Sequence, residues 1–292
     1  MAKESNTIVP AKPQDWSFLD DEARKLVVWP DRNIDMHVHS MYSDGLRPPA
    51  ELVKLYHENG YDLIAVTDHD GVDGVPEAQK AGAALGMTVL TGIEFGTLFR
   101  GKIEFHLLGY DFDLEDPGLR KELEEIRAYR IRRNEKLMAY FRGKGYDISF
   151  DDMIRYSGQD YIGKPNFARA LIRKGYCKSV KEAFDSGELL GSPEAMALKK
   201  KPVPTGDAIR WIRSAGGIPV LAHPMETVGI GPAGSRVFFE NLDRILGELV
   251  SDGLLGVECF HPSATEDESL RLTRLAARYH LRITRGSDYH GF

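Results

Sequence analysis

Histidine and carboxylate side chains recur in this sequence as short fragments, and each fragment follows or interrupts an apolar run. The fragments are His37-x-His39, Asp44, His69, Glu94, His106, His223 and Asp288-x-His290. They supply six imidazoles and three carboxylates, which are too many ligands for a single metal ion. Mixed imidazole and carboxylate ligands suit zinc, iron or manganese better than calcium or magnesium. The set therefore predicts a hydrolase that uses several metal ions.

The apolar runs beside these fragments are typical of β-strands. They cover residues 34–38, 63–67, 89–95, 218–222 and 283–286. Side chains at the carboxyl ends of several strands converge when those strands form one barrel or sheet. We therefore expect the fragments to meet in one site.

The spacing within the first fragment supports a shared ion. Residues two apart on a strand face the same side, so His37 and His39 can bind one ion together. A short polar loop follows and carries Asp44-Gly45, where the glycine allows a sharp turn that brings Asp44 back toward the same cavity.

Other members of the set leave more than one interpretation open. Asp68 is a candidate to hold the imidazole of His69 in one tautomer, although Asp68 or Asp70 could instead cap the following turn. Glu94 lies in an apolar strand, where a buried carboxylate is costly unless a cation neutralises it. His106, taken alone, is also compatible with a hydrogen-bonded core histidine.

Strands and helices alternate on both flanks of the chain, and this favours parallel strands wrapped by helices. We expect helices at residues 50–59, 77–85, 206–215, 238–251 and 265–279, and further strands at 102–110 and 255–260. Residues 33–111 and 206–292 are thus predicted to form one barrel that carries the metal site. Residues 1–32 form an extension, with a short helix near residues 20–28.

The middle of the chain breaks this rhythm and is predicted to be helical throughout. Helical patterns cover residues 117–143, 150–157, 166–175 and 179–187. We interpret residues 112–205 as a helical insertion that caps the barrel mouth. It is mildly basic, which also fits an ordinary solvated helix surface.

Composition excludes several classes of protein. The chain has 292 residues and a formal net charge of −6, so nothing draws it globally toward nucleic acid or anionic membranes. No apolar run is long enough to span a bilayer, and the first residues lack the core of a signal peptide. Cys177 and Cys259 form no Cys-x-x-Cys pair. We expect a cytoplasmic location and no membrane partner.

The ordered motifs H-x-H, S-D-G, T-D-H, the strand Glu, A-H-P and G-S-D-x-H resemble the PHP (polymerase and histidinol phosphatase) superfamily. The resemblance covers about residues 33–110 and 205–292 and is closest to stand-alone phosphoesterases with a helical insertion, such as nucleotide 3′,5′-bisphosphate phosphatases and 5′-to-3′ exoribonucleases. It implies a distorted (β/α)7 barrel with three divalent metal ions (Mn, Fe or Zn). It also implies three ligand groups, of which the first two share Glu94: His37, His39, Glu94 and Asp288; Glu94, His106 and His223; Asp44, His69 and His290.

Part of the insertion, residues 162–169, resembles a family stretch that usually reads R-P-H-(I/F)-A-R. Here Lys164 replaces the arginine and Asn166 replaces the histidine. A lysine can bind phosphate only as a point charge. We expect Lys164 and Arg169 to grip a second phosphate together, with Asn166 and His261 as further substrate-binding candidates. The alternatives are surface charges at a helix start and, for His261, an ordinary loop histidine.

Family members commonly continue well past the last histidine, whereas this sequence ends two residues after His290. This indicates either a missing closing element or a trimmed chain.

The chemistry implied by these ligands is attack on phosphorus by a metal-bridging hydroxide. The sequence identifies no catalytic side chain beyond the metal ligands, and the group that protonates the leaving oxygen stays open. The expected activity is hydrolysis of a small, nucleotide-like bisphosphate (3′,5′-bisphosphate to 5′-monophosphate) or of a cyclic phosphate, without a stable nucleic-acid complex. The alternatives are a 5′-to-3′ exonuclease on short RNA or DNA, and a non-catalytic metal-binding module that serves a partner complex.

Overall fold

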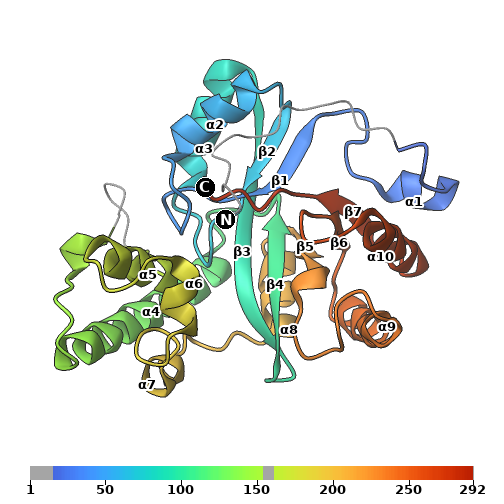
Figure 1. Cartoon of the computed structure of the whole chain (residues 1–292). Helices are drawn as coiled ribbons and strands as arrows, with labels where there is room; N and C mark the ends of the chain where they lie inside the picture. Colours follow the sequence, from blue (N-terminus) through green and yellow to red (C-terminus); the bar gives the residue numbers. More distant parts are fainter. Residues whose placement is uncertain (1–15, 154–160, 292) are drawn as a thin grey trace.

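The computed structural model describes residues 16–153 and 161–291, and its centre is one sheet of seven strands that curls into a nearly closed barrel (Figure 1). The strands lie in chain order around the sheet, and bridges between Val38 and Tyr289 bring its two edges together. The strands are β1 (Ile34–Val38), β2 (Leu63–Val66), β3 (Thr88–Phe99), β4 (Ile103–Tyr110), β5 (Ile218–Leu221), β6 (Gly256–Phe260) and β7 (Arg282–Arg285).

One strand departs from the expected parallel order. β4 runs antiparallel to both β3 and β5, whereas the other neighbouring strands are parallel. The reason is the connection between β3 and β4, which is too short for the crossover that parallel strands need. Gly101, with φ of 68°, lies in this turn, where glycine adopts a left-handed conformation without steric cost. The barrel is confirmed, but the expectation of parallel strands was wrong for β4.

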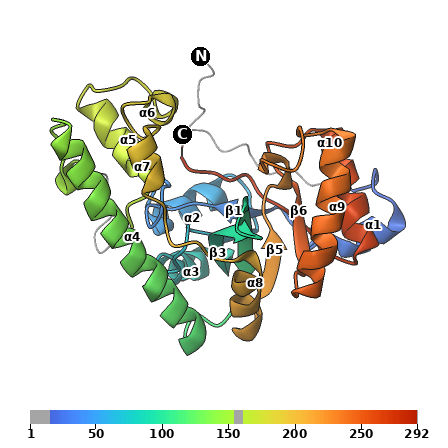
Figure 2. The same cartoon turned by 90° about the horizontal axis from the view of Figure 1, so that it is seen from below.

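Helices cover the outside of the barrel, as the alternation of patterns predicts (Figures 1 and 2). They are α1 (Asp21–Leu26), α2 (Pro49–Glu58), α3 (Val75–Leu85), α8 (Thr205–Ser214), α9 (Arg236–Ser251) and α10 (Glu266–Arg278). Side chains cap their first turns where the sequence supplies them: Ser235 accepts from the backbone N–H of Phe238, and Thr265 accepts from that of Glu268.

The predicted middle region is helical in its described part. It contains α4 (Pro117–Gly143), the 3₁₀ turn η1 (Phe150–Asp152), α5 (Lys164–Arg173), α6 (Val180–Asp185) and α7 (Pro193–Ala197). The predicted helix at residues 150–157 lies partly outside the described residues, and α7 was not predicted. These helices gather to one side of the barrel in both views (Figures 1 and 2).

The barrel and the helical region each have apolar clusters of their own. α2 and α3 pack on β1 and β2 through a cluster that includes Leu52 and Ile64, and α8, α9 and α10 pack on the other strands through a larger one. The second half of α4 packs with α5 to α7 through its own buried cluster, which includes Phe141 and Phe167. The division at residues 112 and 205 remains a prediction.

None of the described helices combines the length and the apolar character needed to cross a lipid bilayer.

Candidate metal centre

The barrel brings all nine predicted ligands into one site, in which His37, His39, Asp44, Glu94 and His223 are buried and the other four are partly exposed. His37 lies in β1 and His39 follows it, whereas Glu94 lies within the long strand β3. His69 pairs with Glu94 through an isolated parallel bridge, and His106 faces Gly96 of β3 across the β3–β4 hairpin. His106 therefore reaches the site from the middle of an antiparallel strand rather than from the end of a parallel one.

Glu94 is the centre of the cluster and is almost fully buried. Its Oε1 lies 2.8 Å from His106 Nδ1, 3.1 Å from His223 Nε2 and 3.4 Å from His37 Nε2. Its Oε2 lies 2.9 Å from His69 Nδ1 and 3.3 Å from His39 Nε2. Both oxygens of one carboxylate therefore face imidazoles, which is the arrangement that a carboxylate shared between two ions requires.

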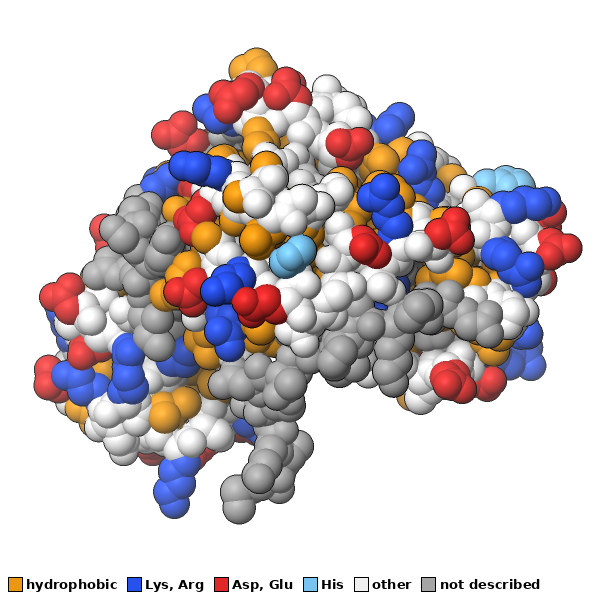
Figure 3. All heavy atoms as spheres, turned by 90° about the horizontal axis from the view of Figure 1, so that it is seen from above, with side chains coloured by type: hydrophobic (Ala, Val, Ile, Leu, Met, Phe, Trp, Pro, Cys, Tyr) orange, Lys and Arg blue, Asp and Glu red, His pale blue; other side chains and the backbone are white. Residues whose placement is uncertain are grey.

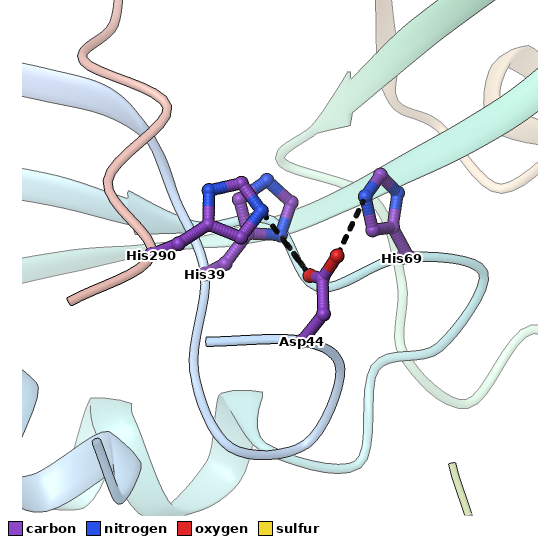
Figure 4. Close-up of side chains that lie close together, drawn as sticks. All are labelled: His39, Asp44, His69 and His290. Carbon is purple, nitrogen blue, oxygen red and sulfur yellow. Dashed lines mark ion pairs between the residues drawn. The ribbon is translucent and has the colours of Figure 1, made fainter. Parts of the chain in front are cut away.

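Three groups of ligand atoms within 4.8 Å of one another emerge, and they overlap strongly with the three expected ones. The groups are His37, His39, Glu94 and Asp288; His69, Glu94 and His106; and His39, Asp44, His69 and His290. Figure 4 shows the last group, in which Asp44 pairs with His69 and His290. His223 lies beside Glu94 and so complements the second group, while His69 stands between the second and the third.

The distances between the ligand atoms suit a shared metal ion better than direct hydrogen bonds between the side chains. Nε2 of His37 and of His39 lie 3.3 and 3.0 Å from Asp288 Oδ1. Two ligands that each lie about 2.1 Å from one tetrahedral ion are separated by about 3.4 Å. Buried ligand atoms nevertheless lack a hydrogen-bond partner among the described residues: His37 Nε2, His39 Nε2, Asp44 Oδ1, Glu94 Oε2 and His106 Nδ1. Close atoms without hydrogen bonds are expected when all point toward a shared third atom.

The charges of the cluster balance one another in the metal-free protein. Burial alone would raise the pKa of Glu94 and Asp44, but the surrounding imidazolium groups, His69 foremost, hold the pKa of both carboxyls well below the usual range. Burial alone would lower the pKa of His39, yet Asp288 and Glu94 raise that pKa to about 10. Protons thus occupy positions from which metal ions must displace them.

This competition predicts how the stability of the metal-free protein depends on pH. An unfolded histidine has a pKa of about 6.5, and the pKa of folded His39 is about 10. The contribution of protonated His39 to the stability of the folded protein is therefore complete below about pH 6.5 and is lost as pH rises toward 10. We expect the melting temperature of chelator-treated protein to fall from pH 6.5 to pH 9.5, and metal affinity to fall as pH is lowered. A His39→Gln variant with the same pH slope as wild type would contradict this prediction.

Asp68 does not hold His69, so this expected role was wrong. Its carboxylate accepts hydrogen bonds from Ser40 N at 2.8 Å, from Ser40 Oγ at 2.6 Å and from Ser43 Oγ at 2.6 Å. Adjacent residues at a strand end point to opposite sides, so Asp68 and His69 face different groups. Asp68 instead fixes the loop that carries Asp44.

Two further buried carboxylates support the site and were missed in the sequence. Asp35 accepts hydrogen bonds from Tyr56 Oη at 2.9 Å and from the backbone N–H of Ser287 at 2.9 Å, just before Asp288. Glu258 lies within 3.2 Å of His37 Nδ1. Each is a lone carboxylate in an apolar strand, which is the signal that identified Glu94.

The four predicted substrate-binding residues lie at different distances from the metal centre and have different hydrogen-bond partners. His261 lies beside the site, with Nε2 at 3.9 Å from Asp288 Oδ2, and Arg169 donates from Nη2 to the backbone oxygen of Asp44 at 2.9 Å. Lys164 donates from Nζ to Ala195 O at 3.0 Å, and Asn166 accepts from the N–H of Gly163. Lys164 and Arg169 thus have separate partners in this structure, and their shared grip on a phosphate stays a prediction.

A basic cluster lies next to the metal centre, and of its members only Lys164 was singled out in the sequence. We use this term for Arg130, Arg133, Lys164 and Lys200. Arg130 and Lys200 pair with Asp70, the residue after His69, at 2.7 and 3.7 Å. Arg133 is buried, and its Nε has no hydrogen-bond partner among the described residues. Burial, together with the nearby Arg130, lowers the pKa of Arg133 to about 10.

Tyr161 connects the basic cluster with the metal centre. The guanidinium of Arg130 lies over its ring at 4.1 Å. Burial raises the pKa of Tyr161, Arg130 opposes that rise and the nearby carboxylates of Asp44 and Asp70 add to it. The ring is therefore close to the cations and to the candidate ligands alike.

Comparison with known proteins places these features in a family. The sequence pattern of the PHP domain matches residues 35–215. A 3′,5′-nucleoside bisphosphate phosphatase from Chromobacterium violaceum is 30% identical over 88% of this chain and 87% of its own length. A 5′-3′ exoribonuclease from Haemophilus influenzae is 27% identical over 89% and 90% of the two chains. A structure described as a metal-dependent phosphoesterase from Bifidobacterium adolescentis superposes with a TM-score of 0.76, at 28% identity, over 88% of this chain and 87% of the other.

Proposed function

The chain belongs to the PHP domain family and is a metal-dependent phosphoric ester hydrolase, and we propose that its substrate is a small, nucleotide-like bisphosphate. It would convert a 3′,5′-bisphosphate to the 5′-monophosphate; a cyclic phosphate is the related candidate. We propose that the metal ligands are His37, His39, Asp44, His69, Glu94, His106, His223, Asp288 and His290, and that three divalent ions, Mn, Fe or Zn, occupy the site.

When bound, such ions lower the pKa of water and neutralise negative charge on the reacting phosphate. The side chains of this protein then have two tasks, which are to hold the ligands in place and to orient the rest of the substrate. Glu94 links the ligand groups through its two oxygens. Asp68 fixes the Asp44 loop, so the ligand side chains are held before substrate arrives.

The observation that carries the choice of substrate is the buried guanidinium of Arg133. A buried charge is costly unless a counter-charge compensates it. Asp70 already pairs with Arg130 and Lys200, while Lys164 lies near enough to Arg133 that burial and repulsion from Arg133 lower the pKa of Lys164. The excess positive charge favours a second anionic group on the substrate, away from the reacting phosphate.

A cavity beside the basic cluster has the size of a nucleoside site. It measures about 310 Å³, and this volume lies at the lower end of the range for small-molecule sites. Its walls are mixed: the aromatic and apolar side chains of Tyr42, Val72, Leu123 and Tyr161 alternate with the charged ones of Asp70, Asp73, Arg120, Glu124, Arg127 and Arg130. The two tyrosines suit stacking on a base and the arginines suit a phosphate, so the cavity supports a compact nucleotide.

The relatives support the same choice without deciding it. One is named a bisphosphate phosphatase, another an exoribonuclease and a third, from Eggerthella lenta and 28% identical, a phosphoribosyl 1,2-cyclic phosphate diphosphodiesterase. A nuclease needs a basic track that extends beyond the site. On the face drawn in Figure 3, basic and acidic side chains are interspersed, and the coloured residues form no continuous basic track.

Product analysis tests the proposal. We expect the manganese-loaded protein to release one equivalent of inorganic phosphate from adenosine 3′,5′-bisphosphate and to leave the 5′-monophosphate, because the second phosphate is held by the basic cluster. Chromatography of the reaction identifies the product, and chelator-treated protein is the control. Absence of phosphate release, or release of the 5′-phosphate instead, would contradict the proposal.

A further inference from the structure

Glu258 is a fully buried carboxylate of β6 that faces two of the proposed metal ligands at once. Its Oε1 and Oε2 lie 3.2 and 3.3 Å from His37 Nδ1. Its Oε2 also accepts a hydrogen bond from the backbone N–H of His223 at 2.8 Å. We propose that Glu258 is a positioning residue that fixes the tautomer of His37 and the backbone of His223, so that both imidazoles face Glu94. The inference rests on the assignment of these histidines as ligands.

The contact with His37 determines which ring nitrogen is free. An ionised carboxylate only accepts hydrogen bonds, so in the neutral ring Nδ1 of His37 carries the proton and Nε2 keeps its lone pair for a metal ion. That Nε2 lies 3.4 Å from Glu94 Oε1 and 3.3 Å from Asp288 Oδ1. A carboxylate behind a histidine ligand both orients the ring and makes it more basic.

The contact with His223 acts on the backbone. His223 has φ of 22° and ψ of 63°, a conformation on the left-handed side that non-glycine residues rarely adopt. Such strain persists only where surrounding contacts hold it. The carboxylate of Glu258 accepts from the N–H of this strained residue, and the imidazole then reaches Glu94 with Nε2 at 3.1 Å from Oε1.

The neighbouring strand leaves room for the carboxylate. A Cβ atom at Gly286, just after β7, would lie 2.4 Å from Glu258 Oε1 and 2.2 Å from His37 Cβ. Only glycine therefore permits the close approach of Glu258 and His37. The contact depends on residues from β1, β6 and the segment after β7, so it is built into the barrel.

The first test is Glu258→Gln, measured by calorimetric titration of the chelator-treated protein with Mn²⁺. A glutamine keeps the shape of the side chain. Its amide group, however, turns an N–H toward one of the two N–H groups from which Glu258 accepts, those of His37 Nδ1 and of the His223 backbone. We expect Mn²⁺ affinity to fall by about 10- to 100-fold, whereas Glu248→Gln on α9, at a half-buried residue that pairs with Arg100 rather than with a ligand, should leave it unchanged. An Mn²⁺ affinity equal to wild type in Glu258→Gln would overturn the proposal.

Two further measurements separate positioning from packing. In the imidazole ¹⁵N spectrum of the zinc-loaded protein, we expect the protonated Nδ1 signal of His37 in wild type to be weakened in Glu258→Gln. A merely structural role would lower the melting temperature and leave both that signal and the affinity of the folded protein unchanged. If Glu258→Gln does not fold, Gly286→Ala displaces the carboxylate while keeping its charge, and wild-type affinity there would overturn the proposal.

The ligand assignment is tested separately by His37→Ala. If this variant keeps the full metal content, the proposed ligand set is wrong, whatever Glu258 does. If it loses metal while Glu258→Gln binds as wild type does, only the positioning role of Glu258 is wrong.

Discussion

Glu94→Gln should abolish both metal binding and phosphoesterase activity, lowering kcat by at least about 10³-fold, at the upper end of the loss seen when one main electrostatic group is removed from an active site. Both carboxylate oxygens of Glu94 face imidazoles, at distances from 2.8 to 3.4 Å. An amide offers one weak acceptor in place of two charged ones, so the ions that Glu94 links lose a shared ligand. Elemental analysis and steady-state kinetics of the same preparation measure both effects.

The matched control is Glu104→Gln, the same change at an exposed position of β4. It should keep wild-type metal content and wild-type kcat. If Glu94→Gln retained two or more ions per chain and more than a tenth of the activity, the assignment of Glu94 as a shared ligand would be wrong.

Arg133→Met should lower kcat/KM for a 3′,5′-bisphosphate by roughly 10- to 150-fold while leaving a plain phosphomonoester almost unaffected. This range corresponds to the loss of about 1.5–3 kcal/mol from a hydrogen bond to a charged group. Metal content should not change, because Arg133 contacts none of the ligands. Methionine also removes a buried guanidinium whose Nε lacks a partner, so the melting temperature of the free protein should stay equal or rise.

Arg132→Met is the control, since Arg132 precedes Arg133 on α4 but is exposed. This variant should keep the wild-type kcat/KM for both the bisphosphate and the monoester. An equal loss for bisphosphate and monoester in Arg133→Met would place Arg133 at the reacting phosphate. No loss for either would show that the basic cluster does not bind substrate.

The strands and the convergence of the candidate ligands could be predicted because local signals agree. A single histidine or carboxylate that follows or interrupts an apolar run carries little information. The recurrence of this pattern at several strands of one chain indicates a shared site. β1 matches its predicted range of residues 34–38, and α4 matches 117–143. The antiparallel direction of β4 was missed because strand–helix alternation on both flanks was extended to a connection too short to cross over.

The substrate side of the site was harder to predict because it depends on helix geometry. Lys164 and Arg169 are five residues apart, which places them about 140° apart around a helix of 3.6 residues per turn. They therefore face different neighbours, Ala195 O and Asp44 O. Arg133, by contrast, was overlooked although the helix pattern could have identified it. Its position continues the buried stripe of α4 between Ile126 and Leu137. A charged residue in such a stripe is a signal that sequence patterns contain.

The proposal of a compact substrate is tested most directly by comparing kcat/KM for a nucleoside 3′,5′-bisphosphate and for an oligonucleotide of about ten residues. Both are measured with one preparation of the metal-loaded protein under one metal condition. The buried cations and the small cavity predict that the bisphosphate is preferred by tenfold or more, which is about 1.4 kcal/mol in transition-state stabilisation. A tenfold preference for the oligonucleotide would contradict the account and make the protein an exonuclease.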